Sequence, residues 1–389
     1  MIGRRNLLRG SLLSGSILIS GFDKFRWPEF FPSQVSDPFR EGTQIGVVDF
    51  SDEGKAPMGQ AIGAELDGRL FTDHSKLKPE NPVTPTSSFY IRTRASKFLD
   101  NTKPWSIQIG GLIEKPSAIS VEDLEKIAQP MGLHLMECAG NSRSAHFGML
   151  SVADWEGIPL QGILENAKLK PQATRVLISG FDHYAAESNS SWPGASWIFT
   201  LEQLKSSRAF LATKMNSQHL TADHGAPIRL VVPGWYGCTC IKWVNEMTLV
   251  EEDAPATSQM QEYASRTMQN GVPTLAKDYV PALIDAAAMP IRVEKWLVAG
   301  KIKFRVVGIQ WGGSRPIEGL EIQFNAEEDY VPVDDFRIST HDSWSFWNKA
   351  WTPQKGGRYL IRLRLKGSNN VARRLDSGYY MRSVEITET

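Results

Sequence analysis

The feature that most constrains the fold is an alternation of apolar and basic residues near the C-terminal end of the chain. Residues 301–311 (KIKFRVVGIQW) and 359–367 (YLIRLRLKG) both contain runs in which an apolar residue alternates with lysine or arginine. Successive side chains of a strand point to opposite faces, so a period of two predicts strands with one buried and one solvated face. With no helical stretch between the turn signals, residues 251–389 are expected to form an antiparallel β-sandwich.

The preceding residues, 36–250, mix strand and helix patterns and predict an α+β domain. Strands are expected at 88–94 (SFYIRTR), 105–112 (WSIQIGGL), 174–182 (TRVLISGFD) and 227–234 (PIRLVVPG). Helices are expected at 119–129 and 200–215, because each begins with a capping-box pair: Ser120 with Asp123, and Thr200 with Gln203.

Two segments lack such periodicity. Residues 22–85 are rich in proline, aspartate and glycine and predict leader and wrapping loops. Residues 251–273 (EEDAPATSQMQEYASRTMQNGVP) are polar and predict the connection between the two domains. At 389 residues the chain exceeds one ordinary hydrophobic core, which agrees with a division into two domains.

The charge balance excludes one class of partner. Lysine plus arginine and aspartate plus glutamate each number 43, so the net charge is zero. No basic stripe or polybasic tail accompanies this balance, which argues against nucleic acid or an anionic membrane surface as a partner.

Residues 1–35 predict a leader. The paired arginines Arg4 and Arg5 precede an apolar run at 12–19 that is too short to span a bilayer, which takes about 20 residues. This pattern is typical of a twin-arginine export signal, and a periplasmic or otherwise exported protein is expected. An ordinary basic leader or a frayed helix is the alternative. Export of a folded protein would allow a cofactor to be loaded in the cytoplasm first.

The common catalytic motifs are absent from the sequence. It contains no Walker loop, no G-x-G-x-x-G, no H-E-x-x-H and no C-x-x-C. Residues 140–144 (GNSRS) approximate the nucleophile elbow of a serine hydrolase but lack its last glycine. Nucleotide binding and zinc-protease chemistry therefore have no sequence support, and serine hydrolysis has little.

Three cysteines are too few for a disulfide framework. Cys238 and Cys240 lie too close together for a relaxed bridge and are expected to be buried or semi-buried thiols. Cys138 ends an apolar run and is followed by small and polar residues and by Arg143. A thiolate binds thiophilic metals, and a nearby arginine lowers a thiol pKa and can hold an oxyanion. A buried structural cysteine is equally compatible with these residue types.

Two longer motifs carry a family resemblance. Residues 137–143 (ECAGNSR) and 216–243 (NSQHLTADHGAPIRLVVPGWYGCTCIKW) resemble the molybdopterin domain of the sulfite oxidase family. Residues 308–324 and 343–351 resemble the immunoglobulin-like dimerisation domain of the same family. The resemblance covers roughly residues 80 to 389. It implies the sulfite oxidase fold for 36–250, an immunoglobulin-like β-sandwich for 251–389, a homodimer, molybdenum bound to molybdopterin, and no haem, because the family's haem-binding domain has no counterpart.

The resemblance also implies roles for individual residues. Cys138 would be the protein thiolate on molybdenum. Contacts to the pterin and its phosphate would come from Tyr90, Arg92, Thr93, Asp182, His224, Arg229, Cys240, Ile241 and Lys242. A buried phosphate needs arginine and lysine donors, and a pterin edge needs fixed hydrogen-bond partners. Arg92, Arg143 and Arg315 would surround a small sulfur oxyanion.

The sequence departs from the family pattern at two positions. Ser142 replaces the first arginine of C-A-G-N-R-R, and Thr213 replaces a tyrosine whose hydroxyl lies near the metal in sulfite oxidases. The loss of that tyrosine questions sulfite as the substrate and leaves Thr213 as a candidate pocket residue. His146 has no family counterpart and either tunes the pocket or satisfies a loop.

The expected function is oxo transfer to sulfite or a related small sulfur compound, with electrons passed to an external carrier such as a cytochrome. Reduction of an S-oxide or N-oxide at the same metal is the alternative. A metal-free binding or assembly protein is a third hypothesis, and the thiolate and phosphate-site motifs count against it.

Overall fold

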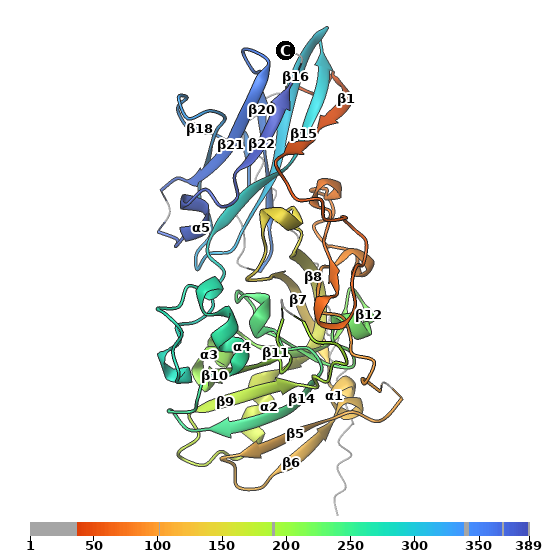
Figure 1. Ribbon diagram of the computed structural model, residues 1–389, viewed down its shortest axis with the longest axis vertical. Coiled ribbons are helices and arrows are strands. Elements are labelled where there is room, and N and C mark those ends of the chain that lie inside the picture. Colours follow the sequence, from red (N-terminus) through yellow and green to blue (C-terminus); the bar gives the residue numbers. More distant parts are fainter. Residues whose placement is uncertain (1–36, 101, 189–190, 338–341, 368, 388–389) are drawn as a thin grey trace, which may run out of the picture.

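The structure, a computed structural model, describes residues 37–100, 102–188, 191–337, 342–367 and 369–387. Its sheets fall into two groups that are stacked along the long axis of the molecule (Figure 1). The leader expected at residues 1–35 lies outside the described residues. No helix in the described part of the chain is long and apolar enough to cross a membrane.

The lower group contains two five-stranded sheets and, among residues 106–250, three short α-helices. The first sheet has the order β10 (Ser196–Thr200), β9 (Arg175–Gly180), β14 (Val244–Val250), β5 (Ser106–Gly111) and β6 (Ser117–Ser120). The second has the order β12 (Gln218–His219), β11 (Phe210–Met215), β8 (Leu150–Pro159) and β7 (Gln129–Glu137), with β13 (Arg229–Val231) also pairing with β11. The helices are α1 (Val121–Lys126), α2 (Leu160–Asn166) and α3 (Leu201–Ser206).

The predicted helix starts are confirmed. The Ser120 hydroxyl accepts the Asp123 N–H at 3.2 Å, and the capping box of Thr200 and Gln203 forms both of its hydrogen bonds. The helix expected at 200–215 is too long, because α3 ends at Ser206 and residues 210–215 form β11. β11 pairs with both β8 and β13 and is almost wholly buried, so sheet pairing outweighs the local helical pattern.

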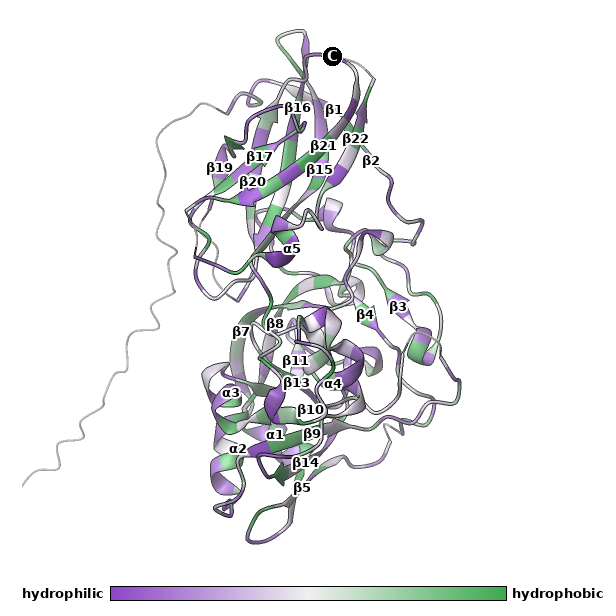
Figure 2. Cartoon of the chain, turned by 60° about the vertical axis from the view of Figure 1, so that its left-hand side comes forward, coloured by the Kyte–Doolittle hydropathy of each residue, from purple (hydrophilic) through white to green (hydrophobic). Residues whose placement is uncertain are grey.

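The upper group consists of two antiparallel five-stranded sheets. One has the order β1 (Thr43–Val48), β15 (Ala287–Val298), β16 (Lys301–Trp311), β20 (Ser345–Trp351) and β19 (Asp335–Phe336). The other has the order β18 (Val331–Pro332), β17 (Leu320–Gln323), β21 (Gly357–Leu365), β22 (Arg382–Ile386) and β2 (Phe50–Ser51). Both alternating segments of the sequence are therefore strands, and Figure 2 shows hydrophilic and hydrophobic bands along these sheets.

An aromatic cluster joins the two upper sheets. Trp351 of β20 stacks on Phe324, which follows β17, with ring centroids 4.3 Å apart, and meets Tyr359 of β21 edge-on at 4.8 Å. The two faces thus pack against each other, as in a sandwich.

The N-terminal strands belong to the upper group. Residues 22–85 were expected to form loops, but β1 pairs with β15 and β2 pairs with β22. The expectation is wrong for residues 43–51, because their pairing partners lie more than 200 positions away and leave no local signal. The polar segment 251–273 contains the helix α4 (Ser258–Tyr263), which begins at the N-cap Thr257. A small helix, α5 (Arg373–Asp376), lies at the lower end of the upper sheets (Figure 1).

Candidate active site

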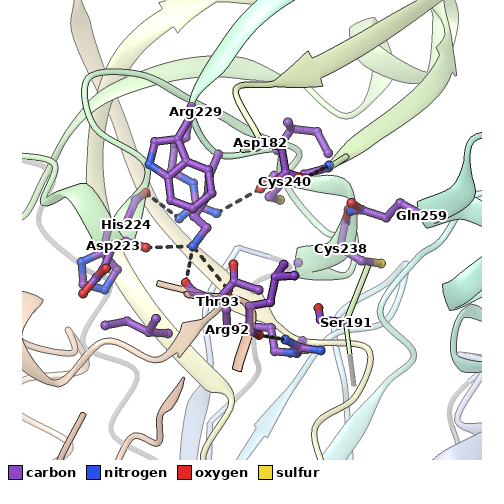
Figure 3. A pocket seen from close by; sticks show the side chains of 18 of the residues that line it. Arg92, Thr93, Asp182, Ser191, Asp223, His224, Arg229, Cys238, Cys240 and Gln259 are labelled. Carbon is purple, nitrogen blue, oxygen red and sulfur yellow. Dashed lines mark hydrogen bonds between the residues drawn. The ribbon is translucent and has the colours of Figure 1, made fainter. Parts of the chain in front are cut away.

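One cavity brings together all ten residues to which the sequence assigns the metal and the cofactor. Its walls come from β4 (Ile91–Arg92), which pairs with β3 (Arg69–Leu70), and from the end of β7, the turns at 222–224 and 237–242, and α4. The cavity holds about 790 Å³ of empty space, its open mouth included. Figure 3 shows the polar side chains of its wall.

Cys138 directly follows β7 and is 3% exposed. The Gly140 N–H donates to Cys138 Sγ at 3.4 Å, and the backbone of Cys138 is fixed by the Met149 carbonyl at 2.9 Å. The sulfur of a cysteine is a ligand for thiophilic metals. The strand end thus presents a metal-ligating group to the cavity.

Two cations, the buried Arg229 and the half-buried Lys242, form another part of the wall. Lys242 Nζ donates to the carbonyls of Arg92, Thr93 and Asp223, at 3.3, 2.6 and 2.9 Å. Arg229 is 4% exposed and donates to the carbonyls of His224 and Cys240, at 3.0 and 3.2 Å. Carbonyl dipoles orient both side chains, but they do not cancel two positive charges.

The pKa values of both side chains are lowered in this arrangement. Burial lowers the pKa of Lys242 well below its usual value, and the nearby Arg229 guanidinium lowers it further. Burial also lowers the pKa of Arg229. A buried anion would relieve this repulsion, and a phosphate matches both a guanidinium fork and an ammonium group.

Two buried polar atoms in the wall lack hydrogen-bond partners among the described residues: Arg229 Nε, a donor, and Asp182 Oδ1, an acceptor. Asp182 Oδ2 is already bonded to the N–H groups of Gly194 and Ala195. Buried groups of this kind are usually paired, so the cavity offers one donor and one acceptor to a ligand. The residues therefore fit a molybdopterin with an anionic phosphate and a hydrogen-bonding pterin.

His224 enters the wall as a neutral ring. Its Nε2 lies 3.1 Å from the Phe89 carbonyl, which requires a proton on Nε2, and its Nδ1 lies 2.8 Å from the Thr221 hydroxyl. Burial lowers its pKa to about 4. Both ring nitrogens already have protein partners, so the ring sets the shape of the wall without adding charge.

A close approach of backbone and side chain shapes the cavity near Tyr90. A Cβ on Gly237 would lie 2.5 Å from the Tyr90 hydroxyl and 3.2 Å from the Glu137 carbonyl, so only glycine fits there. Cys238 and Cys240 are both buried and free, as expected, and burial raises the pKa of each thiol. Cys240 Sγ accepts a hydrogen bond from the Val232 N–H at 3.4 Å, so its thiol stabilises the turn.

Comparison with known proteins identifies the class of site. Residues 95–258 match the family described as the oxidoreductase molybdopterin binding domain. The sulfite oxidase of Arabidopsis thaliana is 24% identical over 301 residues, which cover 69% of this chain and 75% of the relative. The chain belongs to the sulfite oxidase family of molybdopterin-dependent oxidoreductases. It is thus an enzyme of the oxidoreductase class.

Other relatives have different activities. The NADPH nitrate reductase of Beauveria bassiana is 28% identical over 272 residues, which cover 61% of this chain and 30% of the relative. The chain thus spans about a third of the length of that reductase. The crystal structure of the sulfane dehydrogenase SoxCD from Paracoccus pantotrophus has the same fold, with a TM-score of 0.60, 19% identity, and coverage of 93% of this chain and 97% of that one. Family membership therefore leaves the substrate open.

Three residues that the sulfite oxidase resemblance placed at the substrate do not line the cavity. Arg143 begins a 3₁₀ turn at 143–145, outside the cavity wall. Arg315 is exposed on the loop after β16, where its backbone exchanges hydrogen bonds with the Asn370 side chain. Thr213 is 1% exposed in β11, and its Oγ1 has no partner among the described residues. Of the predicted substrate residues, only Arg92 faces this cavity.

Several wall residues carry no sulfite oxidase motif and escaped the sequence analysis. They are Tyr184, Trp192, Gln259, Glu262 and Tyr263. The last three lie on α4, inside the segment expected to be a connection, and Gln259 bonds to the Cys238 carbonyl. The only local signal was the N-cap Thr257, which accepts the Met260 N–H at 3.2 Å.

His146 satisfies a loop. Its Nδ1 lies 2.8 Å from Glu53 Oε2, and Glu53 also pairs with Arg382 of β22. His146 does not line the cavity, so the structure supports the second of its two expected roles.

Proposed function

We propose that this enzyme transfers an oxygen atom to or from a small sulfur compound at a molybdenum cofactor and exchanges electrons with a separate carrier, which accepts them in substrate oxidation and donates them in oxide reduction. One observation carries the proposal: the Cys138 thiol and two cations, Arg229 and Lys242, that form no ion pair among the described residues line the same cavity. A cysteine that can ligate a metal and two cations that can hold a phosphate match the groups by which a molybdopterin is anchored.

Each wall residue has a defined part in this proposal. Cys138 would hold the metal, Arg229 and Lys242 would hold the phosphate, and Asp182 would accept a hydrogen bond from the pterin. The bound cofactor would supply two-electron oxo transfer and exchange electrons with the carrier one at a time. The buried aromatic and aliphatic wall would exclude competing ligands.

The charges near the cavity favour the second candidate, reduction of a neutral S-oxide or N-oxide. Glu262 lines the wall together with Arg92, whereas Arg143 and Arg315 do not. Burial raises the pKa of Glu262, and the positive charge of Arg92 opposes that shift. Because Arg92 shares the wall with a carboxylate, the wall attracts an anion such as sulfite less than three arginines would. Oxide reduction is therefore the direction that this wall suits better.

The proposal has three further parts, each resting on the sequence. The electron carrier would be a separate protein such as a cytochrome. The upper sheets would be an immunoglobulin-like dimerisation domain, and Arg4 and Arg5 would direct export to the periplasm.

Steady-state turnover tests the proposal. Molybdenum-loaded protein is assayed with sulfite and a one-electron acceptor, and with S-oxides and N-oxides and a reduced dye. Oxide-dependent oxidation of the dye is expected, and it should vanish in Cys138→Ala. Cys240→Ala is the matched control, since it removes another buried thiol of the same wall but keeps the backbone and should retain turnover. Equal activity in Cys138→Ala and wild type would refute the assignment of the metal ligand.

A further inference from the structure

A buried carboxylate lies directly before the proposed metal ligand. Glu137 is the last residue of β7 and is 0% exposed. Its sequence neighbours gave no signal for such a group, because an apolar strand end predicts an apolar side chain. A fully buried carboxylate persists only where several donors hold it.

Three hydrogen bonds hold Glu137, and two come from the upper sheets. Trp311 Nε1, at the end of β16, donates to Oε2 at 2.9 Å. The Tyr380 hydroxyl, two residues before β22, donates to Oε1 at 2.9 Å. Asn141, in the loop that follows Cys138, donates to the same oxygen at 3.2 Å. The carboxylate thus links Trp311 and Tyr380 of the upper group to Asn141. Glu137 and Asn141 lie before and after Cys138 in the sequence.

The upper part also holds the backbone that follows Cys138. Arg374 of α5 lies 3.9 Å from Glu137 Oε1 and donates to the Ala139 carbonyl at 2.7 Å. The Tyr379 hydroxyl donates to the Asn141 carbonyl at 2.6 Å. Glu137, Ala139 and Asn141 therefore each form a hydrogen bond with a residue of the upper group.

The donors fix the chemical identity of the residue. The indole of Trp311 can only donate, and the amide of Asn141 cannot turn over, because its Oδ1 accepts the Met149 N–H at 3.0 Å. A glutamine at position 137 would therefore direct its own NH₂ group at one of these fixed donors, so that two donors would face each other. Only a carboxylate accepts hydrogen bonds at both of its oxygen positions.

We propose that Glu137 is a positioning residue, through which the upper sheets fix the orientation of Cys138 at the cavity wall. This inference rests on the proposed molybdenum function. It gives the upper sheets a part in the active site, without contact between those sheets and the substrate.

The test compares two isosteric changes in the loaded enzyme. Glu137→Gln should lower kcat by about 10- to 100-fold with KM unchanged, and should shift the g values of the Mo(V) electron paramagnetic resonance signal. Glu294→Gln is the matched control: Glu294 of β15 is also buried and accepts from an indole, Trp296 Nε1 at 3.0 Å, and from Arg292 Nε at 2.8 Å. It lies away from the cavity and should leave kcat and the signal unchanged.

Tyr380→Phe is the milder variant if Glu137→Gln does not fold. It removes one donor and should shift the same signal by a smaller amount. Wild-type g values and kcat in the folded Glu137 or Tyr380 variants would overturn the inference. A wild-type protein that takes up no molybdenum would instead overturn the proposed function, so the two failures are distinguishable.

Discussion

Two of the buried imidazoles, those of His74 and His224, make the stability of the protein strongly dependent on pH below neutrality. Burial lowers the pKa of both His224 and His74 to about 4, from an ordinary 6.5. His74 Nε2 lies 2.8 Å from the Leu150 carbonyl, and its Nδ1 is buried without a partner among the described residues. Burial opposes a second proton on either ring, and it outweighs the attraction of the nearby Asp73 and Asp223 carboxylates.

The sign and size of the effect follow from linkage. In the unfolded chain each imidazole binds a proton as the pH falls through 6.5, whereas in the folded chain it does so only near pH 4. Their stabilisation is therefore complete above pH 6.5 and is lost as the pH falls toward 4. At 1.36 kcal/mol per pH unit, each histidine should cost about 2 kcal/mol of unfolding free energy between pH 7.5 and 5, and the pair about 4 kcal/mol.

The assay is urea unfolding of the cofactor-free protein at pH 7.5 and at pH 5. His224→Gln keeps a donor to the Phe89 carbonyl but cannot titrate, and His74→Gln does the same toward Leu150. Each variant should lose about 2 kcal/mol less than wild type between the two pH values. Lys242 and the carboxylates are present in wild type and in both variants, so their contributions to the pH dependence of the unfolding free energy cancel in the comparison. Variants that lose as much as wild type would refute the neutral buried imidazoles.

Three further substitutions test the packing around the site. Gly237→Ala should greatly reduce the molybdenum content of purified protein, because its Cβ would lie 2.5 Å from the Tyr90 hydroxyl; full occupancy would show that the turn yields. Thr213→Val should raise the unfolding free energy of the cofactor-free protein by about 1 kcal/mol, since it removes an unpaired buried hydroxyl, and a loss of stability would reveal a partner for that hydroxyl. Trp155→Ala should cost about 3–5 kcal/mol in urea unfolding, because Trp155 is fully buried against Phe89; a cost below about 1 kcal/mol would contradict that packing.

The sequence was informative wherever the signal is local. Alternation over 301–311 predicted β16 with the bounds that the structure has, and the capping boxes at Ser120 and Thr200 predicted two helix starts. These features depend on side-chain periodicity and on hydrogen bonds within three residues, so they need no distant partner.

Local patterns failed where a distant strand or surface decides. β1 and β11 depend on pairing with β15 and with β8 and β13, and that pairing outweighs the loop-like and helix-like composition of their own residues. The α4 residues Gln259 and Glu262 reach the cavity only because the chain folds back after the molybdopterin-binding motifs.

The sequence by itself pointed to the family and to ten of the residues that meet in the cavity, because motif spacing records which side chains must converge on one ligand. Only the tertiary structure decided that Arg143 and Arg315 stay outside the cavity wall and that Glu262 takes part in it. Only the structure also showed that Trp311 and Tyr380 of the upper group donate hydrogen bonds to Glu137, the residue before Cys138. The charge and geometry of a site depend on which loops and sheets pack together, and no single segment of the chain contains that information.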